Sequence, residues 1–314
     1  ITLYPKNLTG IPSLEKALRE AKADTGKTDD YAHTGTASAG DTIDYQIIST
    51  LPSITSEATY LSCYTFIDTM SAGLTYTKGD VVLEIFSDTA CKNTVTTWKE
   101  ANGYFTVSYN DAQDGKTFMT VEMTAKGLAE INKSKAVYAD ASMVNSGFSD
   151  CTMRLTYTAK VDSDNSLVVG DKGNDNKVVL TWKRTSETFY DTLVDDAHIY
   201  TYGIDLTKLF SDGKGDFSKV EFLVQNETDN YYVQAKLNQD EGVYYVTGHA
   251  ENKADATHFV PVKTGDTKGR ILIKGLEDDT YTMTEVRTDH GYVLLKQDIE
   301  VVISQEESTE SCTI

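Results

Sequence analysis

Two carboxylates occupy predicted strand positions whose neighbours are apolar. Glu285 shares one parity of a strand with Tyr281 and Met283, because the side chains of a strand alternate between its two faces. Asp68 likewise ends an aromatic face within residues 60–68. Burying an ionised carboxylate is costly unless it is paired. The sequence therefore predicts that each of these acids has a cationic partner or a chemical role.

A lysine accompanies the acid in each half of the chain. Lys208 continues the apolar stripe of residues 198–206 in the later half, and the earlier half adds Asn176 at the opening of its last predicted strand. Burial raises the pKa of a carboxyl group and lowers that of an ammonium group, so an adjacent pair can exchange a proton. The neutral amine is a nucleophile. Its attack on an asparagine amide polarised by the protonated acid would release ammonia and leave a Lys-Asn isopeptide bond, without a cofactor.

The elements that must position these groups are mostly strands. The 314 residues suffice for two domains, and an aromatic content of 10% with 19 tyrosines favours β-structure. Alternating patterns bounded by turn residues predict strands at residues 41–52, 60–76, 81–86, 104–109, 151–161, 174–182, 198–208, 220–225, 231–237, 243–248, 270–275, 280–286 and 297–303. Residues 124–132 predict a short helix. The predicted fold class is all-β, with two tandem immunoglobulin-like β-sandwiches and a short helix in the first.

Charge excludes several kinds of partner. The formal net charge is -19, and the acidic residues are spread along the chain, which argues against nucleic acid and anionic membranes. The apolar runs are too short to span a bilayer. Because the chain begins inside a strand-like segment at Ile1 with no signal peptide, we expect it to be a mature fragment.

Metal and hydrolase motifs are absent from the sequence. The four cysteines lack zinc-site spacing, so they are either buried free thiols or include one disulfide, Cys63–Cys151. Residues 162–165 and 212–216 carry aspartates without the full ligand spacing of a calcium loop. No HExxH or GxSxG motif supports hydrolysis. We therefore expect no cofactor and no metal.

Several motifs together resemble the backbone (major) pilins of sortase-assembled Gram-positive pili. Tyr4-Pro5-Lys6-Asn7 is similar to the pilin motif, whose lysine is joined to the next subunit. Residues 40–43, 68–76, 126–132 and 176–182 resemble the pilin middle domain. The resemblance covers nearly the whole chain and implies that Lys6 is an intermolecular cross-link.

The resemblance also implies the roles of an intramolecular site. Carried over by position, Lys16 is the nucleophile, Asp68 the catalytic acid and Asn176 the electrophile, with Asn174 as a rival electrophile. Residues 13–27 have helical spacing and good helix formers, whereas the resembled family begins a strand there. We expect a strand through Lys16 followed by a helical turn. The alternatives are that Lys16 is solvated on a helix face and that Asp68 and Asn176 are ordinary turn residues.

The later half resembles the collagen-adhesin B-type domain, and the earlier half the A-type. Its E-box matches residues 281–285 followed by Gly291-Tyr292, with Met283 replacing a leucine of similar volume. The resemblance implies that Lys208 is a second nucleophile and Glu285 its catalytic acid. Beyond Ile303 the sequence has no asparagine and no LPxTG-like signal, so a plain buried salt bridge stays the alternative.

The predicted organisation follows from these motifs. Residues 1–10 form the pilin-motif segment, residues 11–187 the middle domain, residues 188–197 a polar linker and residues 198–314 the E-box domain. The resemblance implies a non-enzymatic shaft subunit of an extracellular, cell-wall-anchored pilus. Its partners would be identical subunits and a class C-type sortase, with a host-surface ligand as a further candidate. The alternative function is an ancillary pilin or adhesin that binds a host glycan or matrix protein; a glycan-active enzyme would need a pair of acids in an open cleft.

Overall fold

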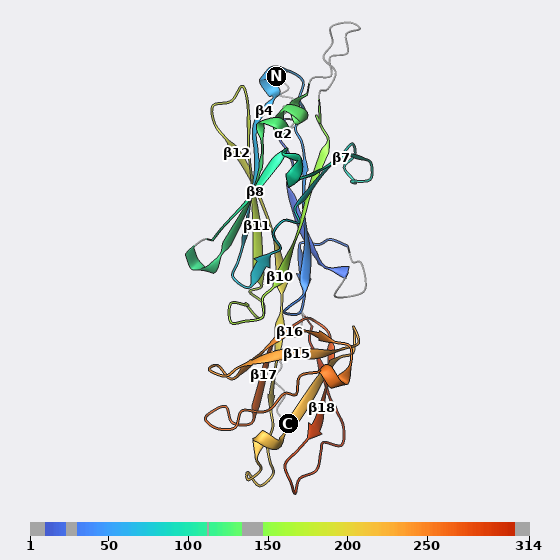
Figure 1. The fold of residues 1–314 in the computed structure, drawn as a ribbon, viewed down its shortest axis with the longest axis vertical. Coiled ribbons are helices and arrows are strands. Elements are labelled where there is room, and N and C mark those ends of the chain that lie inside the picture. The colour runs from blue at the N-terminus through green and yellow to red at the C-terminus, as the bar shows by residue number, and fades with distance from the viewer. Residues whose placement is uncertain (1–9, 23–29, 112, 134–146, 305–314) are drawn as a thin grey trace, which may run out of the picture.

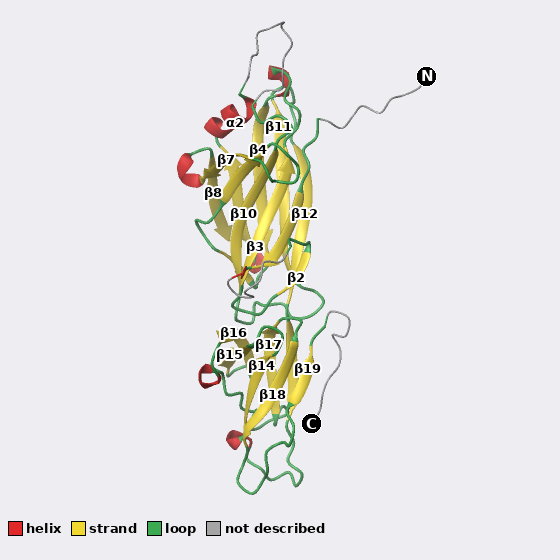
Figure 2. Cartoon of the chain, turned by 90° about the vertical axis from the view of Figure 1, so that its right-hand side faces the viewer, coloured by secondary structure: helices red, strands yellow, loops and turns green. Residues whose placement is uncertain are grey.

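A computed structural model describes residues 10–22, 30–111, 113–133 and 147–304. Figure 1 shows two bodies stacked end to end along the long axis, with the N-terminal body above the C-terminal one. The N-terminal body contains two sheets, and the C-terminal body contains a third, seven-stranded sheet. Figure 2 shows strands running along both bodies, with few helical segments. The predicted all-β fold with one short α-helix is confirmed.

The first sheet of the N-terminal body, sheet A, has the order β1-β3-β10-β6-β7, with β5 paired to β10. Its strands are β1 (Glu15–Glu20), β3 (Thr42–Thr50), β5 (Leu74–Tyr76), β6 (Val82–Phe86), β7 (Thr94–Lys99) and β10 (Thr152–Val161). Along β3 the buried positions alternate with half-exposed ones and include Ile43, Tyr45 and Ile47. This alternation is what a sheet packed on one face requires.

The second sheet, sheet B, has the order β2-β12-β11-β4-β9-β8. Its strands are β2 (Thr34–Thr36), β4 (Leu61–Met70), β8 (Phe105–Asp111), β9 (Thr117–Met123), β11 (Asn174–Arg184) and β12 (Asp191–Tyr200). Strands β11 and β4 are antiparallel, and their register sets Asn176 opposite Met70 and Val178 opposite Asp68. The predicted acid and electrophile are therefore brought close together by neighbouring strands of one sheet.

The C-terminal sheet, sheet C, has the order β13-β17-β16-β15-β14-β18-β19. Its strands are β13 (Tyr202–Thr207), β14 (Glu221–Asn226), β15 (Tyr231–Asn238), β16 (Val243–Ala250), β17 (Arg270–Leu276), β18 (Thr280–Arg287) and β19 (Ile299–Val302). Along β18, Tyr281, Met283 and Glu285 are all buried, as the period of two predicts.

The helical segments are short. Helix α2 (Ala125–Asn132) lies where the sequence predicts it, and the Thr124 hydroxyl caps it by accepting a hydrogen bond from the Gly127 amide at 3.2 Å. Single 3-10 turns lie at Glu57–Thr59, Glu100–Asn102, Gln113–Gly115, Phe217–Lys219 and Lys253–Asp255. Within the described part of the chain, no helix is long and apolar enough to cross a membrane.

The polar segment predicted as a linker, residues 188–197, is not one. Residues 191–200 form β12, which pairs along its length with β11. The alternation of apolar and polar residues does not predict this strand, because most of its side chains are exposed or half-exposed and only Ala197 and Ile199 are buried. The predicted strand at residues 198–208 is correspondingly divided, and the change from sheet B to sheet C occurs at Thr201.

The segment after Pro12 is a strand that continues beyond Lys16 through Glu20, and residues 23–27, in which a helical turn was expected to follow, lie outside the described residues. It pairs antiparallel with β3, with Lys16 opposite Ile47. Strands β2, β7 and β9 were not predicted. Lys6 and Cys312 lie outside the described residues. Cys63 carries a free thiol, with Sγ 3.8 Å from the Thr181 carbonyl oxygen, so the suggested Cys63–Cys151 disulfide is not formed.

Candidate functional site: a buried lysine, aspartate and asparagine around Tyr157

Lys16 is completely buried between the two sheets of the N-terminal body. Strand β1 holds it through the ladder to β3, and the Lys16 backbone amide donates to Asp195 Oδ2 of β12 at 2.6 Å. Strand β12, which includes part of the segment predicted as a linker, thus helps to hold the strand that carries Lys16. Three consecutive residues of β1, Lys16 to Leu18, are buried, which explains why neither helical nor strand periodicity is clean there.

The Lys16 ammonium group lies among aromatic rings and one carboxylate. Its Nζ donates to Asp68 Oδ2 and to the Tyr157 hydroxyl, the latter at 2.6 Å. It also lies 5.1 Å from the ring centroid of Tyr45 and 5.3 Å from that of Tyr157. Burial lowers the pKa of Lys16, and the Asp68 charge opposes that shift. Lys16 is thereby moved toward the neutral form that a nucleophile needs.

Asp68 of β4 is also buried, at 1% exposure, and is held by two tyrosines. Tyr76 of β5 donates to Oδ1 at 2.7 Å, and Tyr157 of β10 donates to Oδ2 at 2.9 Å. Burial raises the pKa of both hydroxyls, and the Asp68 charge raises it further. Both phenols therefore stay protonated as donors. The carboxylate is fixed from sheet A although it belongs to sheet B.

Asn176 of β11 completes the cluster and is fully buried. Its Nδ2 donates to the Tyr157 hydroxyl at 3.0 Å, while its Oδ1 has no hydrogen-bond partner. An amide carbonyl buried without a donor costs about 1–3 kcal/mol. A protonated Asp68 could donate a hydrogen bond to the Asn176 Oδ1.

The rival electrophile, Asn174, is engaged elsewhere. Its Oδ1 accepts from the Val168 amide at 3.1 Å, and its Nδ2 donates to the Val168 carbonyl at 2.9 Å and to Ile199 at 3.4 Å. Both ends of this amide thus fasten the loop before β11 to the strand. The structure places Asn176, and not Asn174, beside Tyr157.

Tyr157 is the residue that the sequence analysis missed. Its hydroxyl contacts all three predicted residues, and its ring stacks on Tyr45 with centroids 5.3 Å apart and an interplanar angle of 9°. Tyr157 lies within the strand predicted at residues 151–161, on the buried face of β10. Only the packing of sheet A on sheet B reveals which hydroxyl reaches the lysine.

The C-terminal body contains the second predicted pair. Lys208 Nζ lies 2.9 Å from Glu285 Oε1, and the Leu295 amide donates to Oε2 at 2.9 Å. The Glu285 side chain is fully buried and that of Lys208 is 11% exposed. Each member of this pair has its partner, and no contact of either with an asparagine is found in the described part of sheet C.

The aspartates of the two aspartate-rich turns, residues 162–165 and 212–216, accept local hydrogen bonds. Asp162 Oδ1 accepts from Thr75 at 2.8 Å, and Asp164 Oδ1 accepts from the Ser166 amide at 2.8 Å. Asp212 and Asp216 accept from the amides of their own turn. Across the described ranges, neither turn contributes to a group of three metal-ligating side chains.

Known proteins resemble this chain in sequence and fold. Residues 203–314 match the family described as SpaA: Prealbumin-like fold domain. The trypsin-resistant surface T6 protein of Streptococcus pyogenes serotype M6 is 24% identical over 301 residues, covering 93% of this chain and 46% of that protein. The chain thus spans about half the length of the curated relative it matches.

Solved structures of pilins share the fold over almost the whole chain. The T6 backbone pilin of S. pyogenes has a TM-score of 0.57 at 16% identity, covering 93% of this chain and 52% of that one. The full-length major pilin RrgB of Streptococcus pneumoniae has a TM-score of 0.61 at 14% identity, covering 97% and 71%. The 35 kDa C-terminal fragment of the major pilin GBS80 of Streptococcus agalactiae has a TM-score of 0.60 at 17% identity, covering 94% and 92%. The predicted resemblance to Gram-positive backbone pilins is confirmed.

Proposed function

We propose that this chain is a shaft subunit of a covalently polymerised pilus on a Gram-positive cell surface, and that an autocatalytic isopeptide bond joins Lys16 to Asn176. The observation that carries the proposal is the buried cluster of Lys16, Asp68 and Asn176 around the Tyr157 hydroxyl. The fold shared with backbone pilins supports it. The protein would be a structural one that reacts once with itself.

Bond formation begins with proton transfer from Lys16 to Asp68, which burial of the ammonium favours. The neutral Nζ then attacks the Asn176 Cγ, and the protonated Asp68 donates a hydrogen bond to the amide oxygen as negative charge develops there. The C–N bond to the side-chain nitrogen breaks, and this nitrogen leaves as ammonia with one proton from the attacking amine. The second proton of the neutral amine stays on the isopeptide nitrogen, and the proton first taken from the Lys16 ammonium stays on Asp68, so charge and atoms balance.

The proposed bond would join the two sheets of the N-terminal body, because Lys16 lies on β1 of sheet A and Asn176 on β11 of sheet B. The covalent loop would contain about 160 residues. A disulfide that closes a loop of that length lowers the entropy of the unfolded chain. By analogy, the cross-link would raise the free energy of unfolding by roughly 5 kcal/mol. A pulling force would then pass through a covalent bond instead of through strand hydrogen bonds.

Polymerisation is proposed to use Lys6, through a class C-type sortase that joins it to the next subunit. Lys6→Ala is expected to abolish sortase-dependent ladders on denaturing gels while the circular dichroism spectrum stays that of the parent. Lys92→Ala, on the exposed turn between β6 and β7, is the matched control and should leave the ladders intact. Ladders that persist in Lys6→Ala would refute the assignment.

A further inference from the structure

The junction between the two bodies is built around a loop that reaches from sheet A onto sheet C. The Ala39 amide donates to the Gly275 carbonyl at 2.9 Å. Gly40 has a φ of +96°, and a Cβ there would lie 2.7 Å from the Thr247 carbonyl oxygen, so only glycine fits this approach. The loop therefore delivers the next side chain, Asp41, directly against β16.

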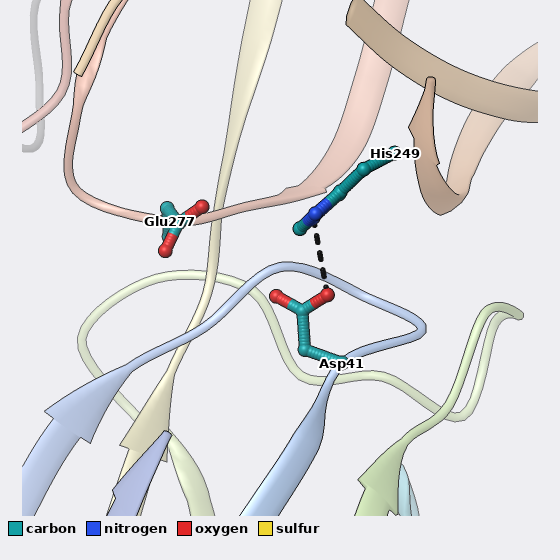
Figure 3. Close-up of side chains that lie close together, drawn as sticks. All are labelled: Asp41, His249 and Glu277. Carbon is teal, nitrogen blue, oxygen red and sulfur yellow. Dashed lines mark ion pairs between the residues drawn. The ribbon is translucent and has the colours of Figure 1, made fainter. Parts of the chain in front are cut away.

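Three metal-ligating side chains meet at this junction. Figure 3 shows Asp41 from the loop before β3, His249 from β16 and Glu277 from the turn after β17 around a common space. The Asp41 Oδ1 and His249 Nε2 atoms are 3.1 Å apart, and one ligand atom from each residue lies within 4.8 Å of the others. Asp41 is 2% exposed and Glu277 is 4% exposed.

Neighbouring groups hold these three side chains in place. Tyr231 donates to Glu277 Oε1 at 2.7 Å, and Ser38 donates to the same oxygen at 3.3 Å. The Ser38 amide donates to Asp41 Oδ2 at 2.8 Å, which leaves Oδ1 directed at the imidazole. The ring of Tyr231 stacks on that of His249 with centroids 3.7 Å apart. Such outer contacts are the kind that orient the ligands of a metal ion.

The charges at this site call for a cation. The buried carboxylates of Asp41 and Glu277, with ligand atoms within 4.8 Å of each other, repel, and the low dielectric around them strengthens the repulsion. The single imidazole offsets the charge of one carboxylate only when it is protonated. A divalent ion would compensate both.

We propose that Asp41, His249 and Glu277 bind a zinc ion that fastens the two bodies together. Zinc takes imidazole nitrogen and carboxylate oxygen, and tetrahedral bonds of that length put neighbouring ligand atoms about 3.4 Å apart, close to the Asp41–His249 separation. An imidazole ligand disfavours calcium and magnesium, which prefer oxygen. Because Asp41 belongs to the N-terminal body and the other two to the C-terminal body, the ion would lock their relative orientation. The inference does not depend on the Lys16–Asn176 bond.

Native mass spectrometry of the intact chain during titration with zinc chloride tests the site. We expect one zinc per chain, with no comparable binding of calcium or magnesium. His249→Ala and the isosteric Asp41→Asn should each weaken zinc binding by more than about 100-fold, since loss of even an outer-shell partner costs 10–100-fold. His258→Ala is the matched control, because His258 is a half-exposed histidine that also pairs with an acid, Glu221.

A second readout places the ion at the junction. Zinc should slow hydrogen exchange of the Ala39 amide in the parent protein and in His198→Ala, which removes the histidine of a more exposed Asp175, Asp196 and His198 group. It should have no such effect in Asp41→Asn. Absence of stoichiometric zinc in the parent protein, zinc retained by both junction variants, or loss of zinc only in His198→Ala would each overturn the proposal.

Discussion

Tyr157 is the residue through which the predicted site is connected. Its hydroxyl receives a hydrogen bond from Lys16, donates one to Asp68 and contacts the Asn176 amide, so a single oxygen relates the amine, the acid and the electrophile. Positioning of this kind supplies much of the rate of an intramolecular reaction. We therefore treat Tyr157 as a positioning residue for the proposed bond.

Replacing Tyr157 by Phe should leave a fraction of molecules without the cross-link, because the amine and the amide lose their shared partner. Tyr64→Phe is the matched control: it removes another fully buried hydroxyl, bonded to Ser49 at 2.6 Å, from the same body. That control should cost about 1 kcal/mol of stability and keep the bond complete. Intact mass measures the unreacted fraction, and equal completion in both variants would remove Tyr157 from the site.

The lowered pKa of Lys16 predicts a pH dependence in protein that cannot form the bond. In Asn176→Ala, the unfolded chain binds the Lys16 proton more tightly than the folded one, so the free energy of unfolding should rise with pH between the folded-state pKa and the ordinary value of 10.5. Urea unfolding between pH 7 and pH 10 measures the slope. The same variant carrying Lys16→Met and Asp68→Asn should have a flatter profile; equal slopes would contradict a buried, shifted lysine.

At the residue scale, the sequence predicted the three chemical groups but not their contacts. Lys16, Asp68 and Asn176 followed from a resemblance and from a carboxylate on an aromatic strand face. Tyr76 and Tyr157 could not be assigned, because strand parity identifies the face of a side chain and not the hydroxyl that it meets on the opposite sheet. The same limit hid the Asp41, His249 and Glu277 cluster, whose members come from three distant segments.

At the scale of elements, tertiary pairing overrode local propensity. Strand β1 has good helix formers, yet its backbone pairs with β3 and the Lys16 amide donates to Asp195 of β12. Strand β7 was missed because only Trp98 is buried along it, as befits the edge of sheet A. Strands with two apolar faces or one short buried stretch give little periodicity, whereas β3 and β18 alternate cleanly and were predicted.

The Lys208–Glu285 pair belongs to this scale because it ties the end of β13 to β18. Lys208→Met should destabilise the C-terminal body by about 3–5 kcal/mol, since Glu285 would be left buried without its cation. Asp205→Asn, which breaks the more exposed pair with Arg270, is the control and should cost less than about 1 kcal/mol.

Hydrogen exchange of sheet C amides is the appropriate measurement for this pair. Both tryptophans, Trp98 and Trp182, lie in the N-terminal body, so their fluorescence would report on the wrong part of the chain. Equal protection in Lys208→Met and Asp205→Asn would show that the buried pair contributes no more than a surface one.

At the scale of the whole molecule, the two bodies form an elongated rod (Figure 1). Lys16 on β1 and Asn176 on β11 belong to the sheets of the N-terminal body. Pulling on both sides of the N-terminal body loads β1 and β12, its first and last described strands. The proposed bond would prevent the extension of about 160 residues between Lys16 and Asn176. At about 3.4 Å per residue, Asn176→Ala should gain about 50 nm of contour length in single-molecule stretching relative to the parent. An equal contour length in both proteins would contradict a load-bearing cross-link.

The most direct test of the central claim is the mass of the intact protein together with its tryptic peptides. We expect the parent chain to be lighter than its sequence by one ammonia, with the Lys16 and Asn176 peptides recovered as one branched species. Asp68→Asn, which keeps the size of the side chain but removes the acid, should have the full sequence mass and two separate peptides. An unmodified parent mass with both peptides free would contradict the account.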